Sequence, residues 1–168
     1  MEPFVKVYIG IDPGITGAIA MIRSTDKFTP PMIKVWKTPV ISGMVDAAEV
    51  ASILSEFTKG YTPLCCIEKA QAMPKQGVVG VFTYGKGYGQ LIACLQIEAI
   101  PFYEIPPGTW KKKYSLIKQP KSISVKVASQ LFPSMTKSLY GPRGGLNDGV
   151  AEALLLADYC RRIGIGDI

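Results

Sequence analysis

The stretch VKVYIGIDPGITGAIAMI, residues 5–22, decides the fold that this sequence predicts. Val5–Ile11 alternates between polar and apolar residues and then becomes apolar, which is typical of a strand that enters a core. Asp12-Pro13-Gly14 ends this strand in a turn, because proline fixes its φ and glycine tolerates the conformation that follows. Gly17–Ile22 reads as a second strand. The stretch therefore predicts a hairpin with Asp12 at the end of its first strand.

With the rest of the chain, the sequence predicts an α/β fold in a single domain that spans residues 1–168. Further strands are expected at Ile33–Trp36, Leu64–Glu68 and Ile100–Ile105. Helices are expected at Asp46–Phe57, from about Gly85 to Glu98, at Thr109–Tyr114, from a cap at Ser122 through Leu131, and from Asn147 or Asp148 to about Arg162. Loops are expected at Gln71–Gly80 and Gly141–Gly145. The order βββαβαβαα predicts a mixed sheet, a three-strand meander plus parallel strands, with helices on both faces.

Composition excludes several classes of protein. Of 168 residues, 48% are apolar, which suits a globular domain rather than a disordered chain, and no apolar run approaches the ~20 residues of a membrane span. The chain has no histidine and no CxxC pair, which excludes zinc sites of the usual kind and Ser-His triads. The four cysteines predict buried free thiols and an intracellular, reducing location, either a bacterial or phage-infected cytoplasm or an organelle.

Positive charge is concentrated in the middle of the chain. Residues 69–147 hold eleven Lys or Arg and two acidic residues, a net charge of +9, so the remainder carries −3 of the total +6. A basic segment beside acidic residues suggests a polyanion held near a metal site.

Four carboxylates are candidates for that site. Asp12 and Glu68 each end a strand, and side chains at the carboxyl ends of neighbouring strands meet at one edge of a sheet. Asp148 and Glu152 are four residues apart and share one face of the last helix, whereas Asp158 is turned away from it. An all-oxygen ligand set selects hard cations such as Mg²⁺ or Mn²⁺, and two such ions can clamp a scissile phosphate.

Each carboxylate also has a purely structural interpretation. Asp12 can shape its turn, and Glu68 can form an ion pair with Lys69. Asp148 and Glu152 both suit the first turn of a helix because of the helix dipole. These interpretations are independent of one another, whereas a single metal site explains all four residues.

Three blocks around these carboxylates, IGIDPGITGAIA, CIEKAQAMP and NDGVAEALLLADY, resemble the RuvC Holliday-junction resolvases. Four further stretches, QAMPKQGV, YGKGYGQLIACL, PPGTWKKKY and VASQLFPSM, resemble the phage and plant-organellar branch of that family. The resemblance implies an RNase H-like fold, a homodimer, and Mg²⁺-dependent paired nicking of four-way DNA junctions. No motif points to a branch-migration partner.

The resemblance also assigns residues. It implies metal-binding and catalytic roles for Asp12, Glu68 and Glu152, although the bacterial family has Asp where Glu152 stands. Asp148 lies one residue upstream of the family's spacing and is kept because it shares a helical face with Glu152. Lys111 and Lys121 fall where the family has phosphate-binding lysines, and Lys121 is expected to assist catalysis.

A DNA-binding surface is expected along the basic segment. Lysines 111–113 stand beside Trp110 and Tyr114, an arrangement that suits phosphate binding with base stacking, or else a solvated basic helix whose tryptophan is in the core. The loop after Glu68 suits base contacts at a junction centre, or is simply a surface loop. The residues expected to bind DNA are Met73, Lys75, Gln76, Lys86, Lys111, Lys112, Lys113, Lys118, Lys121 and Arg143.

The sequence thus predicts a structure-selective DNA endonuclease. Three alternatives remain open: a nuclease for RNA–DNA hybrids or other branched DNA, a junction-binding protein that does not cut, and an actin-like ATPase. The ATPase is disfavoured, because such proteins have two duplicated lobes and this chain has the length of one.

Overall fold

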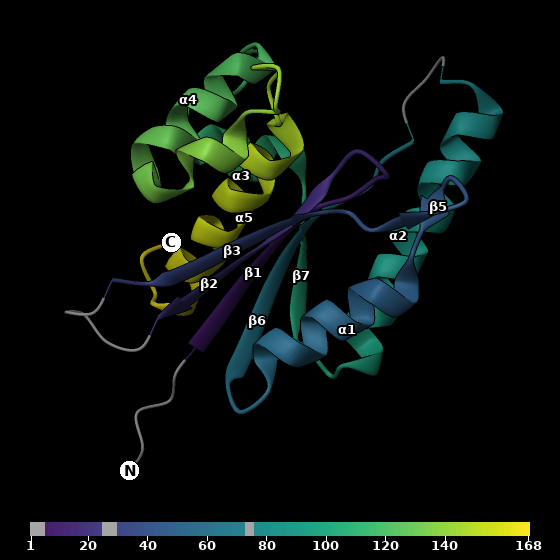
Figure 1. Cartoon of the computed structure of the whole chain (residues 1–168), viewed down its shortest axis with the longest axis horizontal. Coiled ribbons are helices and arrows are strands. Elements are labelled where there is room, and N and C mark those ends of the chain that lie inside the picture. The colour runs from purple at the N-terminus through teal and green to yellow at the C-terminus, as the bar shows by residue number, and fades with distance from the viewer. Residues whose placement is uncertain (1–5, 25–29, 73–75) are drawn as a thin grey trace.

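The computed structural model describes residues 6–24, 30–72 and 76–168, and its centre is a five-stranded sheet (Figure 1). The strand order is β3-β2-β1-β6-β7. The strands are β1 (Lys6–Asp12), β2 (Ala18–Ser24), β3 (Met32–Lys37), β6 (Thr62–Glu68) and β7 (Phe102–Ile105). The sheet is mixed, as the sequence predicted.

Strand pairing brings two carboxylates to one edge of this sheet. β1, β2 and β3 form an antiparallel meander, and Asp12 pairs with Ala18 where the first hairpin turns. β6 runs parallel to β1, and β7 runs parallel to β6. Asp12 and Glu68 are the last residues of neighbouring parallel strands, so both lie at the carboxyl edge.

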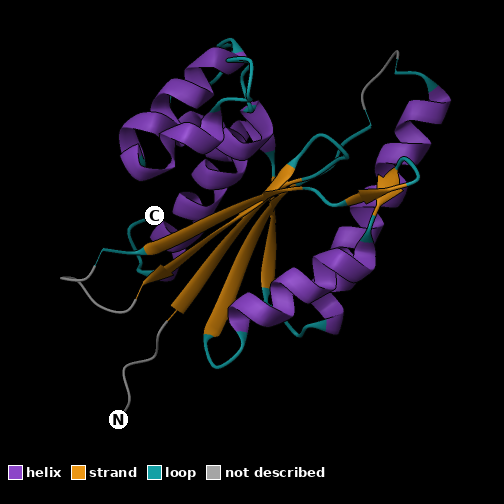
Figure 2. Cartoon of the chain, viewed as in Figure 1, coloured by secondary structure: helices purple, strands orange, loops and turns teal. Residues whose placement is uncertain are grey.

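Helices cover both faces of the sheet (Figure 2). α1 (Ala47–Thr58) and α2 (Val78–Ile97) pack on one face, and α3 (Pro107–Lys113), α4 (Lys121–Leu131) and α5 (Asp148–Gly164) pack on the other. Successive residues of β1 alternate between the two cores: Val7 and Ile9 contact the α1–α2 side, and Tyr8 contacts the α5 side. This is the period-two pattern of a central strand buried on both faces.

α5 crosses the sheet at very short range. A side chain at Gly10 of β1 would clash with the backbone of Ala153 and Ala157. At the start of the helix, a Cβ on Gly149 would lie 2.7 Å from the carbonyl oxygen of Thr16, in the β1–β2 turn. These two glycines therefore let α5 approach β1 closely. Glu152 lies on α5 between these two contacts, three residues after Gly149 and directly before Ala153.

The structure corrects two expected local features and adds two short elements. α2 begins at Val78 rather than near Gly85, inside the segment that was expected to be a loop: its glycines favoured a loop, and its first apolar residues are exposed rather than buried. α4 begins at Lys121 after Pro120, and Ser122 makes no capping hydrogen bond. Two short elements were not predicted: the β4–β5 hairpin (Val40–Ile41 and Met44–Val45) and the 3₁₀ helix η1 (Pro133–Leu139).

The four cysteines, Cys65, Cys66, Cys94 and Cys160, are buried and free, as predicted. Among the described residues, no helix is long and apolar enough to cross a membrane.

Candidate metal centre

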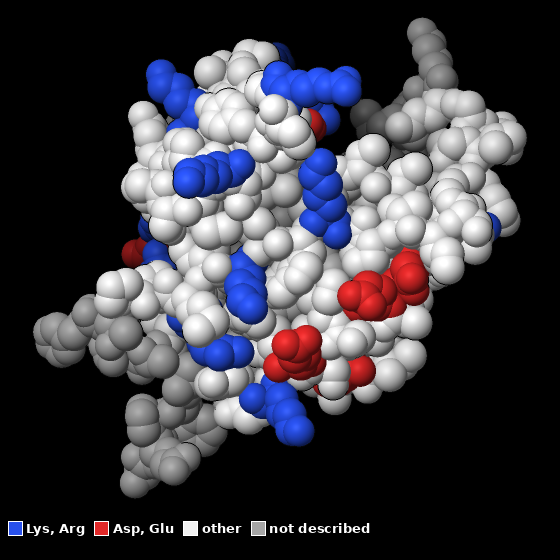
Figure 3. Space-filling model, in the orientation of Figure 1, with Lys and Arg blue, Asp and Glu red and all other residues white. Residues whose placement is uncertain are grey.

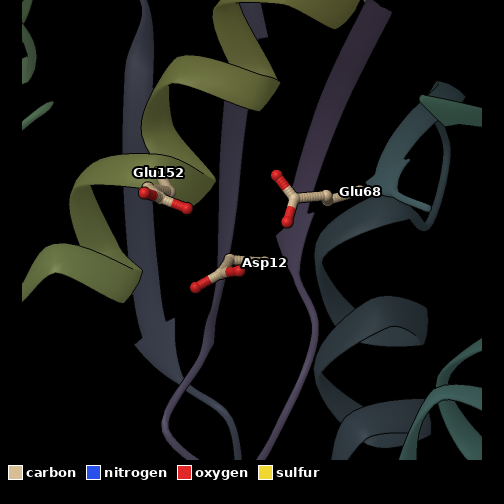
Figure 4. Close-up of side chains that lie close together, drawn as sticks. All are labelled: Asp12, Glu68 and Glu152. Atoms are coloured by element: carbon tan, nitrogen blue, oxygen red, sulfur yellow. The ribbon is translucent and has the colours of Figure 1, made fainter. Parts of the chain in front are cut away.

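Three carboxylates converge at the carboxyl edge of the sheet (Figure 4). Asp12 comes from the end of β1, Glu68 from the end of β6 and Glu152 from the first turns of α5. One oxygen from each lies within 4.8 Å of the others. The sequence predicted all three residues for one site, and the structure brings them together.

Local packing fixes the positions of Asp12 and Glu152. The β1–β2 turn is closed by a hydrogen bond from the amide of Gly17 to the carbonyl of Gly14, at 3.1 Å. Gly149 packs onto this turn, and a Cβ there would lie 3.2 Å from Oδ2 of Asp12. The first turn of α5 therefore rests on the hairpin that carries Asp12, which places Glu152 opposite that residue.

One lysine lies inside the cluster. Nζ of Lys111, from α3, lies 3.4 Å from Oε2 of Glu152 and 3.8 Å from Oε2 of Glu68. Its side chain is only 26% exposed. Lys111 is thus held by two acids of the site rather than extended into solvent like the next two lysines.

The cluster is short of positive charge. Burial, followed by the charges of Glu152 and Glu68, raises the pKa of Asp12 well above its ordinary value, and Lys111 and Lys121 only partly oppose this. Burial also raises the pKa of Glu68, against the lowering effects of Lys111 and of a hydrogen bond from Trp110. Three acids that share one nearby ammonium group have a net negative charge, so the site favours a further cation.

The donor set fits a hard divalent ion. Its members are carboxylates without nitrogen or sulfur, which are the ligands that Mg²⁺ and Mn²⁺ prefer. The site lies at an edge of the sheet, where the side chain of Glu68 keeps 14% exposure, so water and substrate can reach it. The arrangement suits metal-assisted hydrolysis at a phosphate.

Asp148 lies outside the group of three. Its Oδ2 accepts a hydrogen bond from Nζ of Lys121, the first residue of α4. This bond, followed by the charges of Asp148 and Glu152, raises the pKa of Lys121 although partial burial opposes the rise. The structure thus places the two residues as an ion pair beside the cluster, with the lysine side chain 75% exposed.

The other residues that were expected to bind DNA lie on the surface where the structure describes them. Exposed side chains among them are those of Gln76, Lys86, Lys112, Lys113, Lys118 and Arg143. Met73 and Lys75 lie outside the described residues. Figure 3 shows basic side chains over the side of the molecule that holds α3 and α4 and along the sheet, with acidic ones gathered over α1.

Two aromatic residues make contacts at the site that the sequence did not predict. Of the two interpretations of Trp110, base stacking is wrong and a place in the core is confirmed, because the side chain is fully buried. Its Nε1 donates a hydrogen bond to Oε2 of Glu68 at 2.7 Å. Tyr84 of α2 packs against Gly14, where a Cβ would lie 3.4 Å from its ring. Burial and the charges of Glu68 and Asp12 raise the pKa of Tyr84 to about 12. The only sequence signal was the position of Trp110 next to Lys111.

Comparison with known proteins supports the architecture. No protein-family model matches the chain, and no curated protein sequence matches it. The structure of Thermus thermophilus RuvC is similar with a TM-score of 0.60 at 20% identity, covering 94% of this chain and 96% of its own.

Two further solved structures are similar over most of the chain. T. thermophilus RuvC in complex with a Holliday junction substrate has a TM-score of 0.57 at 19% identity and covers 93% of this chain and 95% of its own. The yeast mitochondrial Holliday junction resolvase Ydc2 has a TM-score of 0.51 at 12% identity, covering 92% of this chain and 83% of its own. The chain therefore has the RNase H-like fold of the RuvC structures, as its motifs predicted.

Proposed function

We propose that this protein is a structure-selective DNA endonuclease that resolves four-way junctions by metal-dependent hydrolysis, placing paired, symmetric nicks. The observation that carries the proposal is the convergence of Asp12, Glu68 and Glu152 within 4.8 Å at the carboxyl edge of the sheet. The fold shared with RuvC supports it, since one of those RuvC structures holds a Holliday junction substrate.

Asp12, Glu68 and Glu152 would hold Mg²⁺, for which Mn²⁺ can substitute, and Asp148 would help to hold a second ion. When bound, the metal makes water a better nucleophile and stabilises negative charge on the phosphate and the leaving oxygen. Nζ of Lys111 lies beside Glu68 and Glu152, so its ammonium group would also lie beside a phosphate that binds at the metal site. Because the metal activates water, the reaction needs no histidine base.

Lys121 is the second basic group of the proposed reaction. It is the first residue of α4, its side chain is 75% exposed, and it is held by Asp148 beside the cluster. A phosphate arriving at the site would compete with Asp148 for this ammonium group. Lys121 would then stabilise the charge that develops on the phosphate during cleavage.

Exposed basic residues around α3 and α4 would bind the phosphates of the junction arms. Lys112 and Lys113 directly follow the site residue Lys111, and Lys118 precedes α4. Lys86 on α2 and Arg143 before α5 would extend this surface. We further propose that Met73, Lys75 and Gln76, in the segment between Glu68 and α2, contact bases at the junction centre.

A homodimer would present two such sites to the two symmetric scissile phosphates. The start of α2 is suited to this contact, because Val78, Val79 and Phe82 are 84%, 80% and 71% exposed. Gly85 and Gly89 on the same helix have open space where a side chain would lie. An apolar, glycine-lined helix surface allows a second copy to approach closely.

The four free thiols of the protein fit a reducing intracellular compartment.

The test uses a labelled immobile four-way junction incubated with Mg²⁺, beside a linear duplex, a flap and an RNA–DNA hybrid. We expect paired nicks at symmetric positions of the junction alone. Asp12→Asn should slow cleavage about a thousandfold or more, equivalent to ~4 kcal/mol, and keep junction binding. The matched control is Asp167→Asn, three residues beyond the C-terminal end of α5, which should cut at the wild-type rate.

Other outcomes separate the alternatives. Cleavage of the hybrid or the flap in preference to the junction would favour a different RNase H-like nuclease. Tight junction binding without cutting in Mg²⁺ or Mn²⁺ would favour a binding protein. Wild-type cleavage by Asp12→Asn would contradict the metal site.

A further inference from the structure

Helix α3 contacts two of the three elements that carry the acidic ligands, β6 and α5. It has only seven residues, yet side chains from α3 and its C-cap contact three acids. Trp110 donates a hydrogen bond to Glu68 of β6, and Lys111 contacts Glu68 and Glu152. At the C-cap, Tyr114 donates a hydrogen bond to Asp158 of α5 at 2.8 Å.

The bond from Trp110 to Glu68 differs from the others because its donor is neutral and completely buried. The indole ring has no solvent exposure, and Nε1 has a single hydrogen to donate. Its edge packs against Tyr114 at 6.4 Å between ring centroids, and Nζ of Lys111 lies 5.2 Å from the ring centroid. The ring therefore cannot turn away from Glu68 without repacking α3.

The two partners of Glu68 select one of its oxygens. Both the indole nitrogen, at 2.7 Å, and Nζ of Lys111, at 3.8 Å, lie against Oε2. Within the described part of the chain, no group donates a hydrogen bond to Oε1. A carboxylate held through one oxygen keeps its plane fixed and leaves the second oxygen for another ligand.

We propose that Trp110 is a positioning residue for the metal site, which holds Oε2 of Glu68 so that Oε1 is free to ligate the ion. This inference rests on the proposed metal-dependent function and adds to it a residue that fixes a ligand. Groups that hydrogen-bond to ligating carboxylates restrict their orientation, and their loss typically weakens metal binding about 10- to 100-fold. A buried indole N–H needs a hydrogen-bond acceptor, but a neutral carbonyl oxygen would serve, so the choice of an acid of the site calls for an explanation.

The first test measures Mn²⁺ binding directly, by the electron paramagnetic resonance signal of free Mn²⁺. Trp110→Phe keeps an aromatic ring in the core and removes only the N–H donor. We expect its affinity for Mn²⁺ to fall about tenfold or more. Tyr114→Phe is the matched control, because it removes a donor from the end of the same helix but leaves Glu68 untouched, so it should bind Mn²⁺ as the wild type does.

The control makes the result decisive. An unchanged Mn²⁺ affinity in Trp110→Phe would overturn the proposal. Equal weakening by Trp110→Phe and Tyr114→Phe would also overturn it, because Trp110 would then act only by holding α3 in place. A wild type that binds no Mn²⁺ at millimolar concentration would overturn both the inference and the metal site.

A second measurement keeps Trp110 in place. The chain has two tryptophans, Trp36 and Trp110, so Trp36→Phe leaves Trp110 as the only indole fluorophore. Titration with Mg²⁺ should produce a saturable change in its emission, because an ion on Glu68 draws electron density from the carboxylate that accepts the indole hydrogen. Glu68→Gln should abolish the change, and Glu56→Gln on α1 should retain it. Absence of any change at saturating Mg²⁺ would overturn the proposal.

These readouts do not depend on DNA cleavage. If the protein cuts no junction but Trp110→Phe selectively weakens Mn²⁺ binding, the proposed function fails and the positioning role stands. If the wild type and Trp110→Phe both cut junctions with the same Mn²⁺ dependence, the function stands and the positioning role fails.

Discussion

Helix α5 carries two buried acidic residues, Glu152 and Asp158, whose electrostatic environments are opposite. Near the start of the helix, Glu152 joins Asp12 and Glu68 in a cluster of three carboxylates. Less than two turns further along, Asp158 is a single carboxylate, only 3% exposed. One acid of α5 therefore belongs to a cluster that has too little positive charge around it, whereas the negative charge of the other is fully compensated by neighbouring cations and donors.

Three residues donate four hydrogen bonds to Asp158. Arg161 donates two, from Nη2 at 2.8 Å and from Nε at 3.2 Å. Nε of Arg162 and the hydroxyl of Tyr114 each donate one, both at 2.8 Å. Although burial alone would raise the pKa of Asp158, these bonds lower it below the ordinary value. The pKa of Asp12, by contrast, is raised well above that value.

The contrast is between an acid that is fully paired within the protein and a group of acids that is not. A buried charge that the protein pairs completely needs nothing more and joins two parts of the fold. A group of charges that the protein leaves uncompensated costs stability, and this cost is offset when a cation binds. The pKa values of Asp12 and Asp158 are thus shifted in opposite directions, which is the pattern expected if Asp158 is fully paired and the cluster can still gain stability from a bound cation.

Removing the compensated acid should have the largest effect on stability. Asp158→Asn leaves Arg161 and Arg162 without their shared carboxylate, and breaking such a buried pair costs about 3 kcal/mol. For a chain of this size the melting temperature should fall by roughly 6–12 °C. Chemical denaturation followed by circular dichroism measures the free energy of unfolding.

The same variant should cut junctions at the wild-type rate below its melting temperature, since Asp158 lies outside the cluster. Loss of cleavage by folded Asp158→Asn would show that the two acids are not separable, and the comparison would fail.

The sequence was sufficient to predict the cluster because each of its carboxylates stands at a recognisable place in its own strand or helix. Asp12 and Glu68 end strands with clear apolar patterns, and parallel pairing then brings strand ends together. Helical spacing put Glu152 and Asp148 on one face and turned Asp158 away. The structure agrees for Asp158 and Glu152, but it pairs Asp148 with Lys121.

The partners of these acids could not be predicted in the same way. Lys111 and Trp110 reach Glu68 across 42 or more residues of sequence, and nothing in a single chain's spacing reports such contacts. The start of α2 was missed for another reason: Val78 and Val79 are exposed, so burial does not impose a helical pattern on them. Contacts between distant segments and exposed helices are where single-sequence reasoning fails.

Cations can be compared in the same way as acids. Arg161 and Arg162 are neutralised by Asp158, whereas Lys112 and Lys113 are exposed and form no ion pair in the described part of the chain. Free cations bind phosphate with release of counterions, about 0.9 per contact. Replacing Lys112 and Lys113 by alanine should therefore reduce the salt slope of junction binding by about 2.

Fluorescence anisotropy between roughly 50 and 200 mM salt measures this slope, and the loss of affinity over that range should shrink about tenfold. The matched control replaces Lys6 and Lys59, two exposed lysines at the opposite edge of the sheet, and should leave the slope unchanged. An unchanged slope in the Lys112, Lys113 variant would assign those lysines to solvent and remove them from the binding surface.

The smallest expected effect is the dependence of stability on pH without metal. Because the folded state raises the pKa of Asp12, it binds the proton of that residue more tightly than the unfolded chain does. This contribution is complete below the unfolded pKa and is lost as pH rises through the folded value. Asp158 acts in the opposite sense, since its lowered pKa stabilises the fold above the unfolded value and fails only as pH falls through the folded one.

Between pH 5 and neutral pH, Asp158 therefore stays ionised and its contribution to stability is constant. Over this interval the cluster sets how stability changes with pH. Metal-free wild-type protein should lose a few degrees of melting temperature as pH rises over this interval, and Asp12→Asn should lose less, with Glu68 supplying the remainder. Mg²⁺ should restore the melting temperature of the wild type at neutral pH, because an ion that binds only the folded state stabilises it, and should not restore that of Asp12→Asn. A wild type whose melting temperature ignores both pH and Mg²⁺ would mean that the cluster is as fully compensated as Asp158, and the physical basis for placing a metal there would be gone.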